Sequence, residues 1–243
     1  MPIGIIVNSL AIIIGGVIGT IFGKHISLDF KEKINMIFGA CAMTMSIGSI
    51  VLMKNMPAVV FAVVIGTIIG LAVHFGELVN KLGKAMQSII FRFMKKKESD
   101  ISDAEFNDTL LTIIVLFCAS GTGIYGSIVS GMSGDHTILI SKSILDLFTA
   151  MIFACILGPV VSFIALPQFI IFILLFLGGG IILPFTTPTM IDDFKAVGGV
   201  LLLATGFRMI RVKMFPTADM IPAMILAMPV SLIWSEVILP MLG

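Results

Sequence analysis

Two charged residues, Lys142 and Asp146, stand four positions apart in a predominantly apolar stretch of the sequence. At this spacing both side chains share one face of a helix, where an ammonium group and a carboxylate can pair. A charge inside a membrane-spanning helix needs such a partner and often marks an ion or proton pathway. One interpretation is a buried pair that binds, or is displaced by, a substrate ion or proton. The other is a structural pair near the outer end of the helix, with Lys142 extending to the headgroups.

Small and hydroxyl-bearing residues are concentrated just before this pair, between 120 and 134. Glycines tolerate unusual backbone conformations, so the stretch predicts a broken helix whose free carbonyl and amide groups can coordinate an ion or a carboxylate. A plain flexible turn is the alternative. The candidate ligands from this stretch and the helix after it are Ser120, Thr122, Gly123, Ser127 and Ser143.

Asn8, with Ser9 beside it, is the one amide side chain in the apolar segment 3–23. Its polar group must be satisfied by another helix or by a substrate, because lipid offers no hydrogen bonds. Hydrogen bonding between helices is the commoner explanation, and substrate binding remains open. Glycines at four-residue spacing predict close helix packing. They are Gly15, Gly19 and Gly23, and then Gly66 and Gly70.

The sequence lacks the patterns of enzymes and metal sites. It contains no HExxH, GxSxG or Walker motif, and its three histidines and three cysteines have no metal-ligand spacing. Asp146 has no second carboxylate in an apolar segment with which to form a catalytic dyad. A formal net charge of +1 gives no electrostatic support for a nucleic-acid partner. We therefore expect no enzymatic activity, no cofactor and no metal.

The composition places these residues in a membrane. Of the 243 residues 58% are hydrophobic and 12% charged, with a mean hydropathy of +1.16. A soluble domain of this length cannot bury so much apolar surface. We predict a single all-α membrane domain over 1–243, a helix bundle of about eight spans. The spans are predicted at 3–23, 34–53, 57–75, 107–130, 137–158, 168–187, 195–213 and 219–239.

Basic residues predict the orientation, because they are retained in cytoplasmic loops. With both termini outside, twelve of the 15 lysines and arginines fall in inner loops, Lys54 and Lys195 fall outside, and Lys142 lies within a span. The connection at 76–106 has apolar residues at helical spacing, which predicts an amphipathic helix on the inner leaflet, followed by a linker. Its lysines at 95–97 would face anionic headgroups.

The first three spans return as the last three at a nearly constant offset, which predicts an internal duplication of 2–75 as 167–239 around the central spans at 107–158. The anchors are Pro2 with Pro167, Asp29 with Asp193, and Pro57 with Pro222. Five crossings separate the two starting points, so the copies must be inverted, and their loops carry opposite charge biases. Inverted repeats are a common plan of secondary transporters, although channels also use them.

Long segments of the chain resemble the bacterial membrane-protein family of domain of unknown function 554. They are GIIVNSLAIIIGGVIGTIFGK at the start, GIYGSIVSGMSGDHTILISKSILDLFTA in the centre, and GGVLLLATGFRMI with IPAMILA near the end. The resemblance implies a multi-pass protein of the bacterial inner or plasma membrane. The family has no agreed activity, so it leaves the substrate open.

Together these observations predict a homo-oligomeric secondary transporter or channel for a small solute or ion, embedded in the lipid bilayer. The alternative is a non-transporting membrane scaffold or sensor that binds a partner or lipid. We place the site where the glycine-rich segment and the face of Lys142 and Asp146 meet the first and sixth spans. There, Asp146 should face a cavity and lie within hydrogen-bond reach of Lys142 or the glycine-rich backbone.

Overall fold

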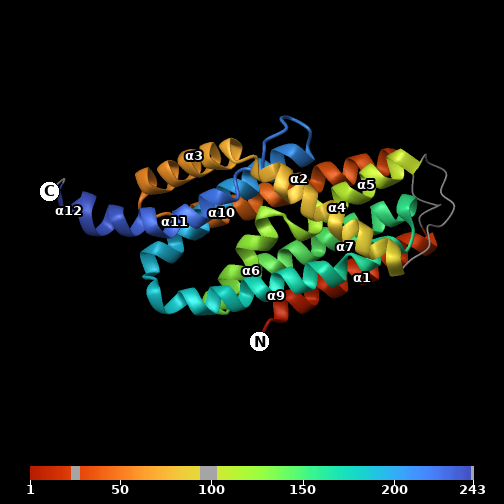
Figure 1. Ribbon diagram of the computed structural model, residues 1–243, viewed down its shortest axis with the longest axis horizontal. Helices are drawn as coiled ribbons and strands as arrows, with labels where there is room; N and C mark the ends of the chain where they lie inside the picture. Colours follow the sequence, from red (N-terminus) through yellow and green to blue (C-terminus); the bar gives the residue numbers. More distant parts are fainter. Residues whose placement is uncertain (23–27, 94–102, 242–243) are drawn as a thin grey trace. The chain divides into compact units, whose positions relative to one another are not determined.

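The computed structural model describes residues 1–22, 28–93 and 103–241, and every regular element in these ranges is a helix (Figure 1). The all-α class is thereby confirmed for the described part of the chain. Gly23, Lys24, the lysines at 95–97 and residues 98–102 of the predicted linker lie outside it.

The helices follow the predicted spans, with additional short elements at the breaks. The main helices are α1 (Ile3–Phe22), α2 (Leu28–Ile50), α3 (Met56–Ala72), α4 (Phe75–Phe93), α5 (Asp103–Cys118), α6 (Gly121–Ser133), α7 (Thr137–Leu157), α8 (Val160–Phe163), α9 (Ala165–Ile182), α10 (Pro188–Met209) and α11 (Pro222–Ile233). A 3-10 turn, η2 (Leu183–Phe185), follows α9, and a π-helical turn, η3 (Trp234–Ile238), joins α11 to α12 (Leu239–Met241).

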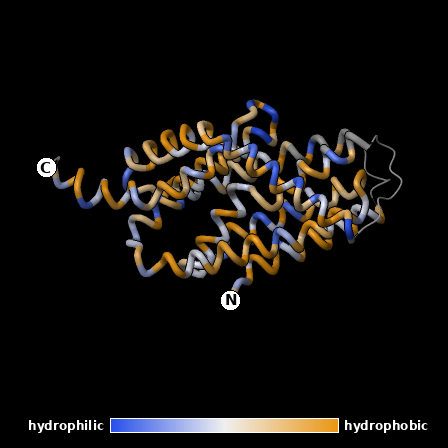
Figure 2. Tube along the Cα trace, viewed as in Figure 1, coloured by the Kyte–Doolittle hydropathy of each residue, from blue (hydrophilic) through white to orange (hydrophobic). Residues whose placement is uncertain are grey.

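Among the described residues, five helical segments are long and apolar enough to cross a membrane, or six if α3 and α4 together form one interrupted span. The five are Ile3–Phe22, Thr109–Ser133, Thr137–Leu157, Val160–Phe185 and Pro222–Met241. Figure 2 shows hydrophobic residues along most of α1 and α3. Two predicted spans fall short: α10 carries two aspartates, a lysine and an arginine, and α2 is apolar only over Met36–Ile50. Eight spans therefore stay a prediction.

The chain forms two compact units, each built from two separate segments. Unit one comprises Met1–Asn35 and Leu78–Gly180, and unit two comprises Met36–Glu77 and Ile181–Gly243. Neither unit matches a single predicted repeat, because each combines residues from 2–75 with residues from 167–239. The first predicted span therefore lies in the same unit as most of the sixth, its counterpart in the repeat. Most of the second span and the third span lie in the same unit as the seventh and eighth.

In unit one α1 lies against α7 (Figure 1). The glycines of α1 make this approach possible: a methyl group added at Gly15 would lie 2.1 Å from the carbonyl oxygen of Leu147, and one at Gly19 would lie 2.0 Å from that of Met151. Backbone touches backbone at these points, so no side chain fits between the helices. The spacing of glycines in α1 thus has the packing role that the sequence predicts.

A cluster of apolar side chains completes unit one on the side of α5 and α8. Ile90 of α4 packs into this cluster, and the rings of Phe91 and Phe106 stack at 6.4 Å between centroids. Leu82 and Ile89 of the predicted amphipathic stripe remain exposed. One part of the apolar face of α4 therefore packs against protein and another part does not.

In unit two, α2 pairs with α10 and α3 pairs with α11. Gly39 meets Gly206, and the Ser46 hydroxyl donates to the Gly199 carbonyl oxygen at 2.8 Å, so the numbering falls along α10 as it rises along α2. Along α3, Gly66 meets Ala223 and Gly70 meets the Asp219 carbonyl oxygen. Both pairs of helices are therefore antiparallel.

The glycine contacts of α1 make a prediction about stability. Gly19→Ala should lower the free energy of unfolding by about 1–3 kcal/mol, because the new methyl group forces α1 away from α7. The matched control is Gly178→Ala in α9, where an added methyl group has no neighbour within 4 Å. The control should equal or exceed wild type in thermal unfolding of the purified protein, since alanine favours helix. Equal stability of both variants would contradict this account of the helix pair.

Candidate functional site

The paired charges Lys142 and Asp146 lie together in the interior of unit one. Lys142 Nζ donates to Asp146 Oδ2 across one turn of α7, and the two residues are 4% and 6% exposed. Lys142 Nζ also lies 5.9 Å from the centroid of the Phe117 ring. The lysine is therefore buried on its carboxylate and does not extend to the surface of the unit.

Two amides and a hydroxyl continue from this ion pair. Asn8 Nδ2 donates to Asp146 Oδ2 at 2.8 Å, Gln168 Nε2 donates to Asn8 Oδ1 at 2.7 Å, and Ser9 Oγ donates to Gln168 Oε1 at 2.7 Å. We call Lys142, Asp146, Asn8, Gln168 and Ser9 the polar chain. It joins α7, α1 and α9, and Asn8 and Gln168 are fully buried.

The carboxylate fixes the direction of every hydrogen bond in the polar chain. An ionised Asp146 can only accept, so Asn8 must present its NH2 group to it. The Asn8 oxygen then faces Gln168, which must donate in turn, and the Gln168 oxygen must receive the hydrogen of Ser9. All the donors therefore point toward the carboxylate. Among the described residues, no buried side-chain nitrogen or oxygen lacks a hydrogen-bond partner.

Gln168 is the member of this group that sequence reasoning missed. The predicted sixth span starts at Gln168, which places the residue at a membrane interface, where a polar side chain needs no explanation. In the structure α9 begins earlier, at Ala165, and follows directly on the short helix α8. Gln168 therefore lies in the first turn, inside the unit. The available signal was its similarity to Asn8, as a lone amide beside a long apolar run.

The predicted break in this helix is present, but the free backbone groups expected along 120–134 are not, because most of that stretch is helical. The interruption between α5 and α6 is confined to Ala119 and Ser120, after which Gly121–Ser133 forms α6. Gly134, with φ of +71°, ends this helix. The physical reason is that the small residues let α9 approach: a methyl group at Gly123 would meet the Phe172 ring at 2.2 Å, and one at Gly131 would meet the Phe176 carbonyl oxygen at 2.0 Å.

The hydroxyl candidates of this region make bonds within their own helices. Ser120 Oγ accepts from the Gly123 amide at 3.1 Å and caps α6. Ser127 Oγ donates to the Gly123 carbonyl oxygen, and Ser143 Oγ donates to that of Leu139, both at 2.7 Å. Such bonds satisfy a buried hydroxyl without a ligand. The structure therefore brings Asn8, Lys142 and Asp146 together, whereas the three serines bond within α6 and α7, Gly123 packs against Phe172 of α9, and Thr122 is buried.

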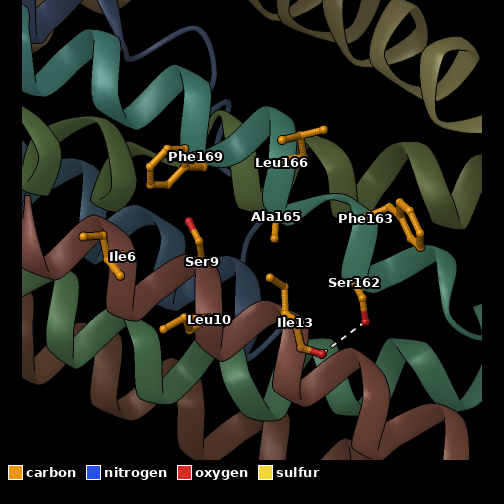
Figure 3. Close-up of a pocket in the computed structure, with 9 residues that line it drawn as sticks. All are labelled: Ile6, Ser9, Leu10, Ile13, Ser162, Phe163, Ala165, Leu166 and Phe169. Carbon is orange, nitrogen blue, oxygen red and sulfur yellow. Dashed lines mark hydrogen bonds between the residues drawn. The ribbon is translucent and has the colours of Figure 1, made fainter. Parts of the chain in front are cut away.

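A cavity of about 530 Å³ lies beside the polar chain, between α1 and the corner formed by α8 and α9 (Figure 3). It is lined by Ile6, Ser9, Leu10, Ile13, Ser162, Phe163, Ala165, Leu166 and Phe169. Ser9 is the member of the polar chain that lines it, and Asp146 does not. The prediction that Asp146 faces a cavity is therefore not met at this cavity. The cavity contacts Ser9 instead, at the end of the polar chain farthest from Lys142.

A second buried carboxylate, Asp193 of α10, lies in unit two and is 1% exposed. Its Oδ1 accepts from the backbone amides of Lys54 and Asn55 at 2.8 and 2.9 Å. Its Oδ2 accepts from Asn55 Nδ2 at 3.0 Å and from the Ser231 hydroxyl at 2.6 Å. In the sequence, Asp193 stands out only as an anchor of the repeat, matched with Asp29. Asp193 directly precedes the predicted span 195–213, at a membrane interface where a charged side chain needs no explanation, so the sequence carried no signal of its burial.

The family described as "Protein of unknown function (DUF554)" matches residues 3–232. The chain is 45% identical over 235 residues to the uncharacterized protein YqgA of Escherichia coli (strain K12), covering 97% of this chain and 98% of that protein. It is 26% identical over 233 residues to the uncharacterized membrane protein YdfK of Bacillus subtilis (strain 168), covering 92% and 93%. No solved structure matches the chain.

The four hydrogen-bond donors around Asp193 lead to a prediction about stability, for which a substitution at the neighbouring Asp192 is the control. Asp193→Asn should destabilise the protein by about 3 kcal/mol, because one carboxylate oxygen becomes an NH2 group that faces other donors. Asp192→Asn removes the same charge one residue earlier, where the carboxylate forms only a 3.7 Å pair with the exposed Lys54, and should cost under about 1 kcal/mol. Thermal unfolding in detergent measures both. Similar losses for the two variants would contradict the assignment.

Proposed function

Since the chain belongs to the DUF554 family of membrane proteins, whose activity is not established, we propose that it is a secondary transporter or channel for a small solute or ion. The five or six apolar segments support a multi-pass chain in the bacterial inner or plasma membrane. The buried polar chain of unit one is the proposed site. We further propose that several copies of the chain assemble into a homo-oligomer.

The observation that carries the proposal is the buried ion pair of Lys142 and Asp146. Removing two charges from water costs several kcal/mol per ion, and apolar residues of similar volume often replace such a pair without loss of stability. Stability alone is therefore a weak reason for the pair. Ionisable groups within membrane-spanning helices otherwise line ion pathways and proton relays.

In the proposed mechanism Asp146 is the group that a substrate cation or proton reaches. The Lys142 ammonium group is bound to the Asp146 carboxylate in the described structure. A substrate cation must therefore displace Lys142, whereas a proton would neutralise Asp146 and so release Lys142. Asn8 donates to the same carboxylate oxygen from α1 and keeps it oriented during the exchange. Movement of Lys142 then couples the occupancy of Asp146 to the packing of α7 against α1 and α9.

We also propose that 2–75 and 167–239 are inverted repeats. The antiparallel pairing of α2 with α10 and of α3 with α11 supports this, because an axis in the membrane plane relates corresponding helices head to tail. At the crossing of α2 and α10 the two backbones touch: a methyl group on Gly39 would lie 3.1 Å from the Gly206 carbonyl oxygen, and one on Gly206 would lie 3.0 Å from that of Gly39.

Flux through sealed vesicles tests the function. Purified protein in proteoliposomes should move at least one ion or small metabolite down an imposed gradient. The double variant Lys142→Met with Asp146→Asn should lower that flux at least tenfold, because it removes both charges. It should keep its fold, since the new amide oxygen still accepts from Asn8 and no unpaired charge stays buried.

The matched control is Lys54→Met with Asp192→Asn, which removes a partly exposed ion pair of the same composition. Flux in the control should stay at the wild-type level. Wild-type flux in the buried double variant would overturn the proposed site. If wild-type protein moves nothing under any gradient while a soluble partner copurifies stoichiometrically, the scaffold or sensor alternative replaces the transporter.

Cysteine labelling tests the proposed topology of eight spans with both termini outside. In a variant without the native cysteines, Lys96→Cys and Met214→Cys should resist a membrane-impermeant maleimide in intact cells and react after permeabilisation. Lys54→Cys should react in both conditions, because its loop is placed outside. Labelling at position 96 in intact cells would reverse the orientation.

A further inference from the structure

We propose that the cavity between α1 and the α8–α9 corner binds an amphiphile with an apolar body and a hydrogen-bond-donating head, a hydroxyl or an ammonium group. The head is held by the oxygen of Ser9 on α1, with Ser162 on α8 as a second acceptor lining the same cavity (Figure 3). This goes beyond the proposed transport function, since it concerns binding alone and holds whether or not the chain moves a solute.

The hydroxyl groups of the cavity determine what kind of head fits. Ser9 and Ser162 are the two lining residues with polar side chains. The Ser9 hydrogen is committed to Gln168 Oε1, and Ser162 Oγ donates to the Ile13 carbonyl oxygen at 3.1 Å. Both hydroxyls therefore turn their hydrogens away from the cavity and offer it only oxygen lone pairs. A ligand must supply the donor, which disfavours ethers and carboxylates.

The polar chain strengthens this preference. Its hydrogen bonds all run in one direction, from Ser9 through Gln168 and Asn8 to Asp146, and aligned hydrogen bonds polarise one another. The Ser9 oxygen is thus the electron-rich end of a chain that terminates on a carboxylate. A carboxamide keeps its hydrogens at neutral pH, so the two amides transmit polarisation and do not pass a proton. The cavity end of the chain is therefore suited to binding.

The remainder of the cavity suits an apolar body taken up from the bilayer. Its walls are otherwise apolar side chains of α1, α8 and α9, and both α1 and the segment Val160–Phe185 qualify as membrane spans. Leu10, Ile13 and Leu166 at the cavity are exposed on the surface of the unit, where lipid is the solvent. A volume of about 530 Å³ is within the usual range for small-molecule sites.

Photolabelling of the wild-type protein in lipid nanodiscs tests the proposal. The probe is 1-decanol with a diazirine in its chain, and adducts are mapped by mass spectrometry to peptides containing residues 6–13 and 162–169. Unlabelled 1-decanol and decylamine compete, beside decyl methyl ether and decanoate as donor-free analogues of similar length. At least one donor should compete at about five- to tenfold lower concentration than both analogues, the effect of one hydrogen bond.

Two tryptophan variants locate the binding. Leu10 and Ile14 are each 50% exposed on α1, and only Leu10 lines the cavity. Leu10→Trp should abolish saturable labelling, whereas Ile14→Trp should retain it. Ser9→Ala should remove the advantage of the donors over decyl methyl ether and leave the labelled peptides unchanged.

The competition experiment uses wild-type protein, so its outcome does not depend on whether any variant folds. Equal competition by decyl methyl ether would show that the cavity takes any acyl chain of the bilayer, and would overturn the proposal. Saturable labelling elsewhere, or none at these peptides because a second copy of the chain covers them, would overturn it as well. Absence of flux would leave this result unaffected, so failure of the transport proposal remains distinguishable.

Discussion

A buried carboxylate can only accept hydrogen bonds, and unit one is arranged around that constraint at Asp146. Three helices deliver donors or orienting groups to it, and each must present one particular face. A shift of one residue in α1 turns its side chains by about 100° and removes Asn8 from the carboxylate. The glycine contacts of α1 with α7 bring the two backbones close enough for a short amide to span the distance. The packing of small residues and the chemistry of the site are therefore one requirement.

Unit two holds its buried carboxylate in a different way. Asp193 takes two backbone amides from the residues just before α3, together with the Asn55 amide and the Ser231 hydroxyl, and the positive end of the helix dipole of α3 adds to them. These donors are fixed by the fold. Asp146 depends instead on the ammonium group of Lys142, a side chain with four rotatable bonds. An aspartate whose counter-charge can swing away is suited to exchanging ligands, and one bound by backbone is suited to joining helices.

Patterns with a local physical cause were predictable from the sequence. The apolar segments predict the helices because their length and composition are those of membrane-spanning helices. The four-residue spacing of Lys142 and Asp146 predicts their ion pair. The burial of Gln168 and Asp193 was not predicted, because each lies where a span begins. Burial at that position depends on which other helices cover the end of the span. The segment at 120–134 misled for a related reason. Glycines and hydroxyls weaken an isolated helix, but close contact with Phe172 and Phe176 of α9 compensates for that weakness.

The division of the chain into two interleaved units has a consequence for biosynthesis. Residues 36–77 belong to a unit whose other half, 181–243, leaves the ribosome more than a hundred residues later. Meanwhile α2 and α3 have neither α10 nor α11 beside them, although Ser46, Gly39 and Gly66 are shaped for those contacts. Domains generally assemble as units during synthesis, at about 5–20 residues per second. The first helices of unit two must therefore wait for seconds with their packing faces uncovered, which is the interval in which a lipid, an insertase or a chaperone can occupy them.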